Sequence, residues 1–145
     1  LEDEPLPVYG DGGQVRDWLH VDDHARALRR ALADGEPGAT YCVGAGEGRT
    51  NLEVVEAICD LLDEMAPRDD GASHRERIEF VEDRPGHDRR YALDPSRIER
   101  ELGWTPRVGF REGLRRTVAW YLEHEDWWRR LRERRYGGER LGRPA

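Results

Sequence analysis

A short, highly charged stretch carries the densest group of chemically useful side chains. Residues 83–95 read DRPGHDRRYALDP, with Arg84 and His87 on either side of a Pro-Gly pair. Proline followed by glycine favours a fixed turn, and a fixed turn lets two side chains converge on one ligand. A guanidinium and an imidazole placed in this way suit a phosphate or a carboxylate. The alternative is a set of surface ion pairs, each contributing at most about 1 kcal/mol.

Arg16 is a second candidate ligand for an anion. It lies between apolar residues in VRDWLHV, a segment that the pattern predicts to be a strand. A long charged side chain there either extends to solvent or meets an anion. Its planar guanidinium suits phosphate or carboxylate. The alternative is an ion pair with Asp17 or Asp22.

The glycine-rich stretch GAGEG, residues 44–48, lies between a predicted strand and a predicted helix. It misses the dinucleotide fingerprint G-x-G-x-x-G, because Gly48 comes one position early and Arg49 takes the place of the third glycine. The start of the helix, with Asn51 in its first turn, could still bind one phosphate. Alternatively GAGEG is only a tight turn, and Thr50 and Asn51 are helix caps.

Other chemistry has little support in this sequence. The five histidines are scattered, and no G-x-S-x-G, H-E-x-x-H or Cys/His metal spacing is present. Cys42 and Cys59 lie in apolar patterns and are predicted to be buried, reduced thiols. All 24 basic residues are arginine, so a mechanism that needs a catalytic lysine cannot be completed here. Catalysis by these residues therefore has little support, and no metal-binding residue is predicted.

Composition places the chain among soluble globular domains. It has 145 residues, of which 38% are charged and 37% apolar, which fits one domain. The net charge of −7 argues against nucleic acid as a partner. No apolar run approaches the roughly 20 residues of a membrane span, and the first residues resemble neither a signal nor a transit peptide. A cytoplasmic location is expected.

The elements that must position these residues alternate between strands and helices. We expect an extended piece before a turn at 10–13, a strand at 15–21, and a helix that Asp22 and Asp23 cap and that ends at Gly35. Ala25, Leu28 and Leu32 would form its buried face. A strand at 40–44 follows, and then a helix that a capping box of Thr50 and Glu53 opens. Its predicted buried stripe is Leu52, Val55, Ile58, Leu62 and Met65.

The second half continues the alternation. After a polar loop at 66–77, in which length variation would cost little, strands are predicted in RIEFVED and RYALD. Asp94 would cap a helix with Pro95 at its first position and Gly103 at its end. A last amphipathic helix would run from Phe110 to Trp128. The alternation predicts the α/β class.

Four segments, in order, are similar to the carboxyl-terminal part of the dTDP-glucose 4,6-dehydratases, a family of extended short-chain dehydrogenases/reductases that act on nucleotide sugars. The segments are PLPVYGDGGQVRDWLHVDDHARAL, GEGRTNLEVVEAICDLLDE, IEFVEDRPGHDRRYALDPSRIERELGW and REGLRRTVAWYLEHEDWW. The resemblance implies an NAD-dependent lyase that yields a 4-keto-6-deoxy sugar and forms a homodimer. Its glycine-rich NAD fingerprint and its Tyr-x-x-x-Lys pair would lie upstream and are not in this sequence.

The resemblance also implies a division of the chain. Residues 1–128 would be the substrate-binding region of a Rossmann-type enzyme whose amino-terminal NAD-binding domain is absent here. Within it, the strand and helix at 15–34 would return to the missing sheet, and 129–145 would be a basic, frayed tail. The resemblance thus implies no catalytic and no cofactor-binding residue in this chain, and this part alone would be inactive.

By the same resemblance, six residues would contact a dTDP-sugar substrate. They are Pro7 and Tyr9 near the base, Arg16 at the diphosphate, Asn51 at the nucleotide, and Arg84 and His87 at the diphosphate and ribose. Arg89, Arg90 and Tyr91 are expected to be supporting residues, as structural partners of Asp83 and Asp88.

Three alternatives remain open at this point. One is another nucleotide-sugar epimerase or decarboxylase of the same superfamily. Another is a nucleotide-binding module without catalysis. The third is an RNA-binding domain that uses the arginine-rich tail, which would bind oligonucleotides in a salt-dependent way.

Overall fold

The structure is a computed structural model that describes residues 4–135. Strands and helices are mixed along the chain, which confirms the predicted α/β class. In chain order the elements are β1 (Leu6–Tyr9), β2 (Val15–Asp17), α1 (Val21–Asp34), β3 (Gly48–Thr50), α2 (Asn51–Met65), the 3-10 turn η1 (His74–Arg77), β4 (Ile78–Val81), α3 (Ser96–Leu102), α4 (Phe110–Glu123) and α5 (Glu125–Arg135).

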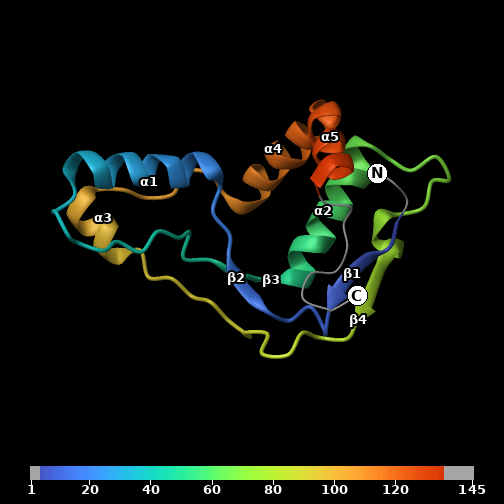
Figure 1. Ribbon diagram of the computed structural model, residues 1–145, viewed down its shortest axis with the longest axis horizontal. Coiled ribbons are helices and arrows are strands. Elements are labelled where there is room, and N and C mark those ends of the chain that lie inside the picture. The colour runs from blue at the N-terminus through green and yellow to red at the C-terminus, as the bar shows by residue number, and fades with distance from the viewer. Residues whose placement is uncertain (1–3, 136–145) are drawn as a thin grey trace.

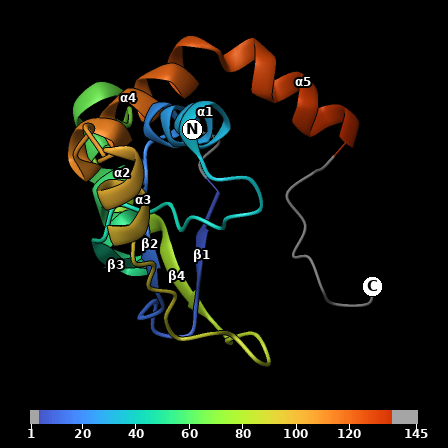
Figure 2. The same cartoon turned by 90° about the vertical axis from the view of Figure 1, so that its left-hand side faces the viewer.

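The two-stranded sheet of β2 and β3 lies between a helical end of the molecule and an end that contains both helices and the second sheet. Figure 1 shows α1 and α3 together at one end, and α2, α4 and α5 beside β1 and β4 at the other. β1 pairs in parallel with β4, with Leu6 opposite Ile78, and β2 pairs antiparallel with β3, with Arg16 opposite Arg49. The segment between β4 and α3 runs past β2, and α5 projects away from the other elements (Figure 2).

The α1–α3 end has its own small core. Ala27, Ile98 and Trp104 are buried together with Leu102. α3 ends as predicted, because Gly103 adopts the left-handed conformation with φ +61°. At its start Pro95 rather than Asp94 is the N-cap, so the helix begins one residue later than predicted, although the Asp94 carboxylate still accepts the Ser96 N–H at 2.9 Å.

The buried face predicted for α1 is wrong. Ala25, Leu28 and Leu32 are all exposed, with 90% of Leu32 accessible, and the buried residues of the helix are Asp23 and Ala27. The helix packs with its other face inward because the buried Asp23 carboxylate accepts backbone N–H groups from the segment after α3. The N-cap is His20, whose ring nitrogen accepts the Asp22 N–H, rather than Asp22 or Asp23.

α2 begins as predicted, with a reciprocal capping box. Glu53 N–H donates to the Thr50 hydroxyl at 3.1 Å, and Thr50 N–H donates to the Glu53 carboxylate at 2.7 Å. Its fully buried residues are Val54, Cys59 and Leu61. The predicted stripe is only partly buried, because α2 packs against both α4 and η1. Its members are Leu52, Val55, Ile58, Leu62 and Met65.

Several predicted strands are shorter than expected or are not formed. The strand at 15–21 ends at Asp17, residues 40–44 form no strand, and 90–94 contribute one bridge, between Arg90 and Val15. A strand needs a neighbour to pair with, and 40–44 has none among the described residues. Cys42, predicted to be buried, is consequently exposed, whereas Cys59 is buried as predicted.

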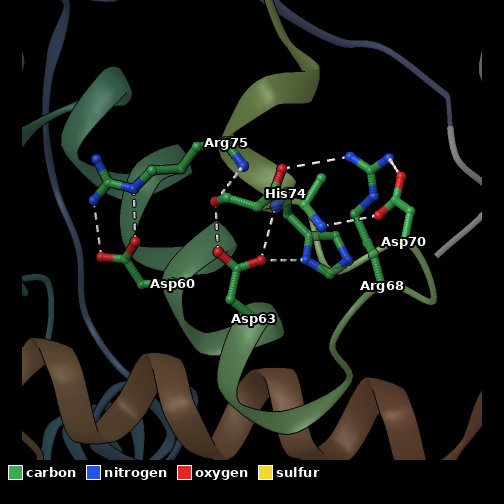
Figure 3. A network of polar contacts seen from close by, with 8 residues as sticks. Asp60, Asp63, Arg68, Asp70, His74 and Arg75 are labelled. Carbon is green, nitrogen blue, oxygen red and sulfur yellow. Dashed lines mark hydrogen bonds and ion pairs between the residues drawn. The ribbon is translucent and has the colours of Figure 1, made fainter.

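A polar network fixes the loop between α2 and β4 (Figure 3). The Asp63 carboxylate accepts hydrogen bonds from the His74 backbone at 2.7 Å, the His74 ring at 2.6 Å and the Ser73 hydroxyl at 2.5 Å. Arg75 donates twice to Asp60, at 2.6 and 2.8 Å. The 66–77 loop is therefore attached to α2 along its second half, which sets where β4 begins.

The last predicted helix is divided in two. α4 ends at Glu123 and α5 begins at Glu125, with His124 as the C-cap between them. Residues 129–135 of the predicted tail continue α5, and residues 136–145 lie outside the described residues. Among residues 4–135, no helix combines the length and the apolar character that crossing a membrane requires.

Candidate anion-binding pocket

Three of the six predicted site residues line one hollow of about 380 Å³. Arg16 comes from β2, whereas Arg84 and His87 come from the loop after β4. Backbone pairing brings these elements together, because Val15 donates to the Arg89 carbonyl at 2.8 Å and accepts from Tyr91 at 3.1 Å. The remaining lining residues are Pro85, Gly86, Asp88 and Tyr91.

The predicted Pro-Gly turn is present between the two loop residues. His87 N–H donates to the Arg84 carbonyl at 3.1 Å, and Gly86 has φ +69°. A turn with proline second and a positive-φ glycine third is common in proteins and holds its flanking side chains in fixed directions. The Arg84 guanidinium lies over the Tyr9 ring, 5.1 Å from its centroid, and donates no hydrogen bond to any described residue. Its N–H groups are therefore available to a ligand.

Asp83 holds His87 in place. The His87 Nδ1 lies 2.7 Å from Asp83 Oδ1, and Gln14 donates to Asp83 Oδ2 at 2.9 Å. The hydrogen bond to His87 is the largest of the contacts that lower the pKa of Asp83, so Asp83 is a carboxylate at neutral pH. A carboxylate only accepts, so the His87 Nδ1 carries the proton. The edge of the ring also contacts Tyr9, with the two ring centroids 6.3 Å apart.

Arg16 forms no ion pair with a carboxylate among the described residues, so the alternative pairing with Asp17 or Asp22 is wrong. Its guanidinium donates to the carbonyls of Val15 at 2.7 Å and Asp88 at 2.8 Å, and lies 4.4 Å from the centroid of the Tyr91 ring. Two of its five N–H donors are therefore occupied, and the others remain for a ligand.

The glycine-rich stretch forms a turn that an internal carboxylate occupies. Asp17 accepts the N–H of Ala45 at 2.9 Å and of Gly46 at 3.1 Å. The start of α2 is occupied as well, because Asn51 N–H donates to the Gln14 carbonyl and Leu52 N–H to the Gly12 carbonyl. The observed geometry is thus the turn-and-cap alternative, and these N–H groups are not free to bind a phosphate.

The other three predicted site residues do not line the hollow. Tyr9 lies directly behind it, in contact with Arg84 and His87. Pro7 lies on β1, exposed and opposite Glu79, and Asn51 opens α2. Tyr91, expected as a support that partners Asp83 or Asp88, does donate to the Asp88 carboxylate, whereas no role was predicted for Gln14.

The described residues contain no group of three or more His, Cys, Asp or Glu side chains that could hold a metal ion. The hollow instead gathers two guanidinium groups and one imidazole, with aromatic rings behind both arginines. Guanidinium groups from separate elements suit a ligand with adjacent anionic groups, such as a diphosphate.

The fold is part of the α/β fold of the extended short-chain dehydrogenase/reductase class, since solved structures of that class superpose on the chain. The chain belongs to the GDP-mannose 4,6 dehydratase family, whose model matches residues 1–117.

Curated relatives are identical to this chain at about half of the aligned positions. The chain is 53% identical over 142 residues to a dTDP-glucose 4,6-dehydratase of Xanthomonas campestris, covering 98% of this chain and 40% of the relative. It is 54% identical over 127 residues to the enzyme of that name from Salmonella typhimurium, covering 88% of this chain and 35% of the relative. The chain thus spans well under half the length of these relatives.

Two solved structures agree with this match. DesIV, a dTDP-glucose 4,6-dehydratase from Streptomyces venezuelae with NAD and TYD bound, has a TM-score of 0.79 at 44% identity, covering 88% of this chain and 37% of that one. A UDP-glucose 4-epimerase from Thermotoga maritima has a TM-score of 0.69 at 31% identity, covering 83% of this chain and 35% of that one.

Proposed function

We propose that this chain is the nucleotide-sugar-binding part of a dTDP-glucose 4,6-dehydratase, an NAD-dependent lyase that converts dTDP-glucose to dTDP-4-keto-6-deoxyglucose. The observation that carries the proposal is the convergence of Arg16, Arg84 and His87 on one hollow. Both arginines have donors that no described residue occupies, and adjacent phosphates need donors from several directions.

The geometry suggests how the ligand would lie. Arg16 and Arg84 would donate to the diphosphate from opposite elements. With Nδ1 held by Asp83, His87 would present Nε2 to a phosphate or a ribose hydroxyl. Tyr9, behind Arg84, would border the nucleoside, with Pro7 further along β1 near the base. Asn51 would contact the nucleotide through its side chain, because its N–H is already bonded.

The residues of this chain do not fit NAD. The glycine-rich turn at 44–48 gives two of its N–H groups to Asp17, so it cannot cradle a pyrophosphate. The chain also has no lysine for a Tyr-x-x-x-Lys pair. We therefore place NAD, which supplies the hydride chemistry when bound, on an amino-terminal domain outside this chain, and we assign no catalytic residue here. The chain alone would be inactive.

The α1 end would meet that missing domain. Four apolar or small residues form an exposed stripe on α1, and residues 40–44 form no paired strand among the described residues. The stripe consists of Val21, Ala25, Leu28 and Leu32. An exposed apolar stripe on a helix suits packing against a larger sheet, and residues 40–44, which pack against the α1–α3 core through Tyr41 and Val43, would pair with the edge of that sheet. Residues 15–34 would thus return to the Rossmann sheet. The full enzyme would be a cytoplasmic homodimer.

The test is turnover and binding by the full-length protein that contains this chain. We expect conversion of dTDP-glucose to an absorbing 4-keto product, saturable dTDP binding by calorimetry, and loss of both in Arg16→Ala. Arg116→Ala on α4, whose side chain pairs with Glu112, is the matched control. dTDP binding without turnover would favour a non-catalytic module, and turnover of UDP-glucose without a keto product would favour an epimerase.

A further inference from the structure

Tyr91 has an unusual combination of contacts for a half-exposed loop residue. Its ring supports the Arg16 guanidinium at 4.4 Å, its hydroxyl donates to the Asp88 carboxylate, and its backbone N–H donates to the Val15 carbonyl. The same Val15 carbonyl accepts from Arg16, and the Asp88 carbonyl accepts the other end of the guanidinium. Tyr91 therefore touches or adjoins every group that holds Arg16.

These contacts fix the plane of the guanidinium as well as its position. Two hydrogen bonds to carbonyls leave a guanidinium able to tilt, whereas an aromatic face beneath it restricts the tilt. The backbone pairing with β2 sets where the ring lies, and the Asp88 bond sets its direction. That bond also raises the pKa of Tyr91, which keeps the phenol protonated as a donor.

We infer that Tyr91 is a positioning residue for Arg16, holding the guanidinium so that its unoccupied N–H edge faces the diphosphate of a nucleotide sugar. The inference rests on the proposed function, since it needs the hollow to bind a nucleoside diphosphate. In addition, the Asp88 carboxylate lines the same hollow and would repel an anionic ligand. The hydrogen bond from the Tyr91 hydroxyl offsets part of this repulsion.

The experiment is a double-mutant cycle on dTDP affinity in the full-length protein. Tyr91→Leu removes the ring, and Arg16→Lys keeps the charge but removes the planar group that stacks. An exposed cation–π contact corresponds to about a fivefold change in the dissociation constant, so we expect about that loss from Tyr91→Leu. In the Arg16→Lys background, Tyr91→Leu should cause less than a twofold further loss.

Tyr91→Phe and Tyr121→Leu complete the set. Tyr91→Phe keeps the ring and loses only the Asp88 bond, so its affinity should fall about twofold or less. Tyr121→Leu removes an equally exposed ring on α4, which contacts Trp120, and should leave the affinity unchanged. For dTDP-glucose turnover, Tyr91→Leu should raise KM and leave kcat within about twofold, because it weakens binding of a group remote from the reacting carbons.

The outcomes test the positioning role of Tyr91 and the proposed function separately. Equal losses from Tyr91→Leu in the wild-type and Arg16→Lys backgrounds would overturn the positioning role, and so would an unchanged affinity in Tyr91→Leu. Thermal unfolding of each variant identifies any that fails to fold, and if Tyr91→Leu does, Tyr91→Gln, which also lacks the ring, takes its place in the same cycle. A wild-type protein that neither binds dTDP nor converts dTDP-glucose would refute the proposed function itself.

Discussion

The carboxylate of Asp23, in the first turn of α1, accepts the backbone N–H of Val108 at 2.8 Å, although 85 residues separate the two in sequence. It also accepts the Arg107 N–H at 2.9 Å and pairs with Arg26, and 1% of its surface is exposed. Burial would raise the pKa of Asp23, but the hydrogen bonds from Arg26, Val108 and Arg107 bring it below its ordinary value. This carboxylate joins α1 to the segment that leads into α4.

Asp23→Ala should therefore destabilise the protein strongly. The change leaves two backbone N–H groups and the Arg26 guanidinium without their acceptor, which corresponds to a loss of about 3 kcal/mol in the free energy of unfolding. Asp22→Ala, on the exposed side of the same turn, should change it by about 0.5 kcal/mol or less. Urea unfolding followed by circular dichroism measures the stability of both variants. Equal losses would show that Asp23 contributes only as a negative charge at the start of the helix.

Acid should weaken the attachment of the 66–77 loop. Hydrogen bonds from the His74 backbone, the Ser73 hydroxyl and the His74 ring lower the pKa of Asp63 from 3.8 to about 2. A group whose pKa is lower in the folded state stabilises that state fully above its unfolded pKa, and this contribution disappears as the pH falls toward the folded value. The gap in unfolding midpoint between wild type and Asp63→Asn should thus be constant from pH 7 to about 5 and close by about pH 2. A gap that is the same at pH 3 and pH 7 would contradict this.

Arg84→Ala should weaken dTDP binding without much effect on folding. A charge-assisted hydrogen bond contributes about 1.5–3 kcal/mol, so the dissociation constant should rise roughly 10- to 100-fold. Arg89→Ala removes the same charge from the same loop at a residue that does not line the hollow. Calorimetry at fixed salt should give at most a few-fold change for Arg89→Ala. Similar losses in both variants would mean that overall loop charge, and not a contact from Arg84, attracts the ligand.

Gly86→Ala tests whether the turn directs the pocket residues. Gly86 and Gly71 have φ of +69° and +71°, and a Cβ at either position would meet no atom within 4 Å. Alanine at each should cost about 1 kcal/mol of stability through backbone strain alone. Only Gly86→Ala should also lower dTDP affinity, because Gly71 lies in the 66–77 loop. Equal dTDP affinity in Gly86→Ala and Gly71→Ala would show that the turn at Gly86 does not direct the residues that bind the nucleotide.

The exposed stripe on α1 predicts opposite effects in two forms of the protein. In the 145-residue chain alone, Leu32→Glu should reduce self-association, since 90% of this leucine is exposed. In a full-length protein that buries the stripe against the NAD-binding domain, the same change should destabilise by about 2 kcal/mol. Ala33→Glu adds the same charge beside the stripe, and it should change neither the self-association of the chain alone nor the stability of the full-length protein. Sedimentation and thermal unfolding would measure the two effects, and a neutral Leu32→Glu in the full-length protein would refute the proposed contact.

Features that depend on near neighbours in sequence were predictable. The Thr50–Glu53 capping box, the Gly103 helix end and the Pro-Gly turn each involve residues at most a few positions apart, and each is present. The inward face of α1 was not predictable, because the contacts of Asp23 with a segment 84 and 85 residues away decide it. Periodicity instead identified the apolar stripe, which in this chain faces outward.

The candidate site shows the same division. The residue types of Arg16, Arg84 and His87 suggested an anion ligand, and their convergence required the pairing of Val15 with residues 89–91. The bond between Tyr91 and the nearby Asp88 was predictable, but the contact of its ring with Arg16 was not, because that contact depends on the pairing of two segments far apart in sequence. It was likewise not predictable that the N–H groups of Ala45 and Gly46 are occupied, because their acceptor, Asp17, lies on β2, far from them in sequence.

The parallel pairing of β1 with β4 bears on the order in which this molecule assembles. Leu6 lies opposite Ile78, and the Gly10 N–H donates to the Val81 carbonyl at 2.9 Å, so most of the intervening chain must be closed into a loop before these contacts form. The residues after β4, and with them the hollow, gain their place only after that closure. We expect a nucleotide added during refolding to slow unfolding of the finished molecule while leaving the early folding rate unchanged.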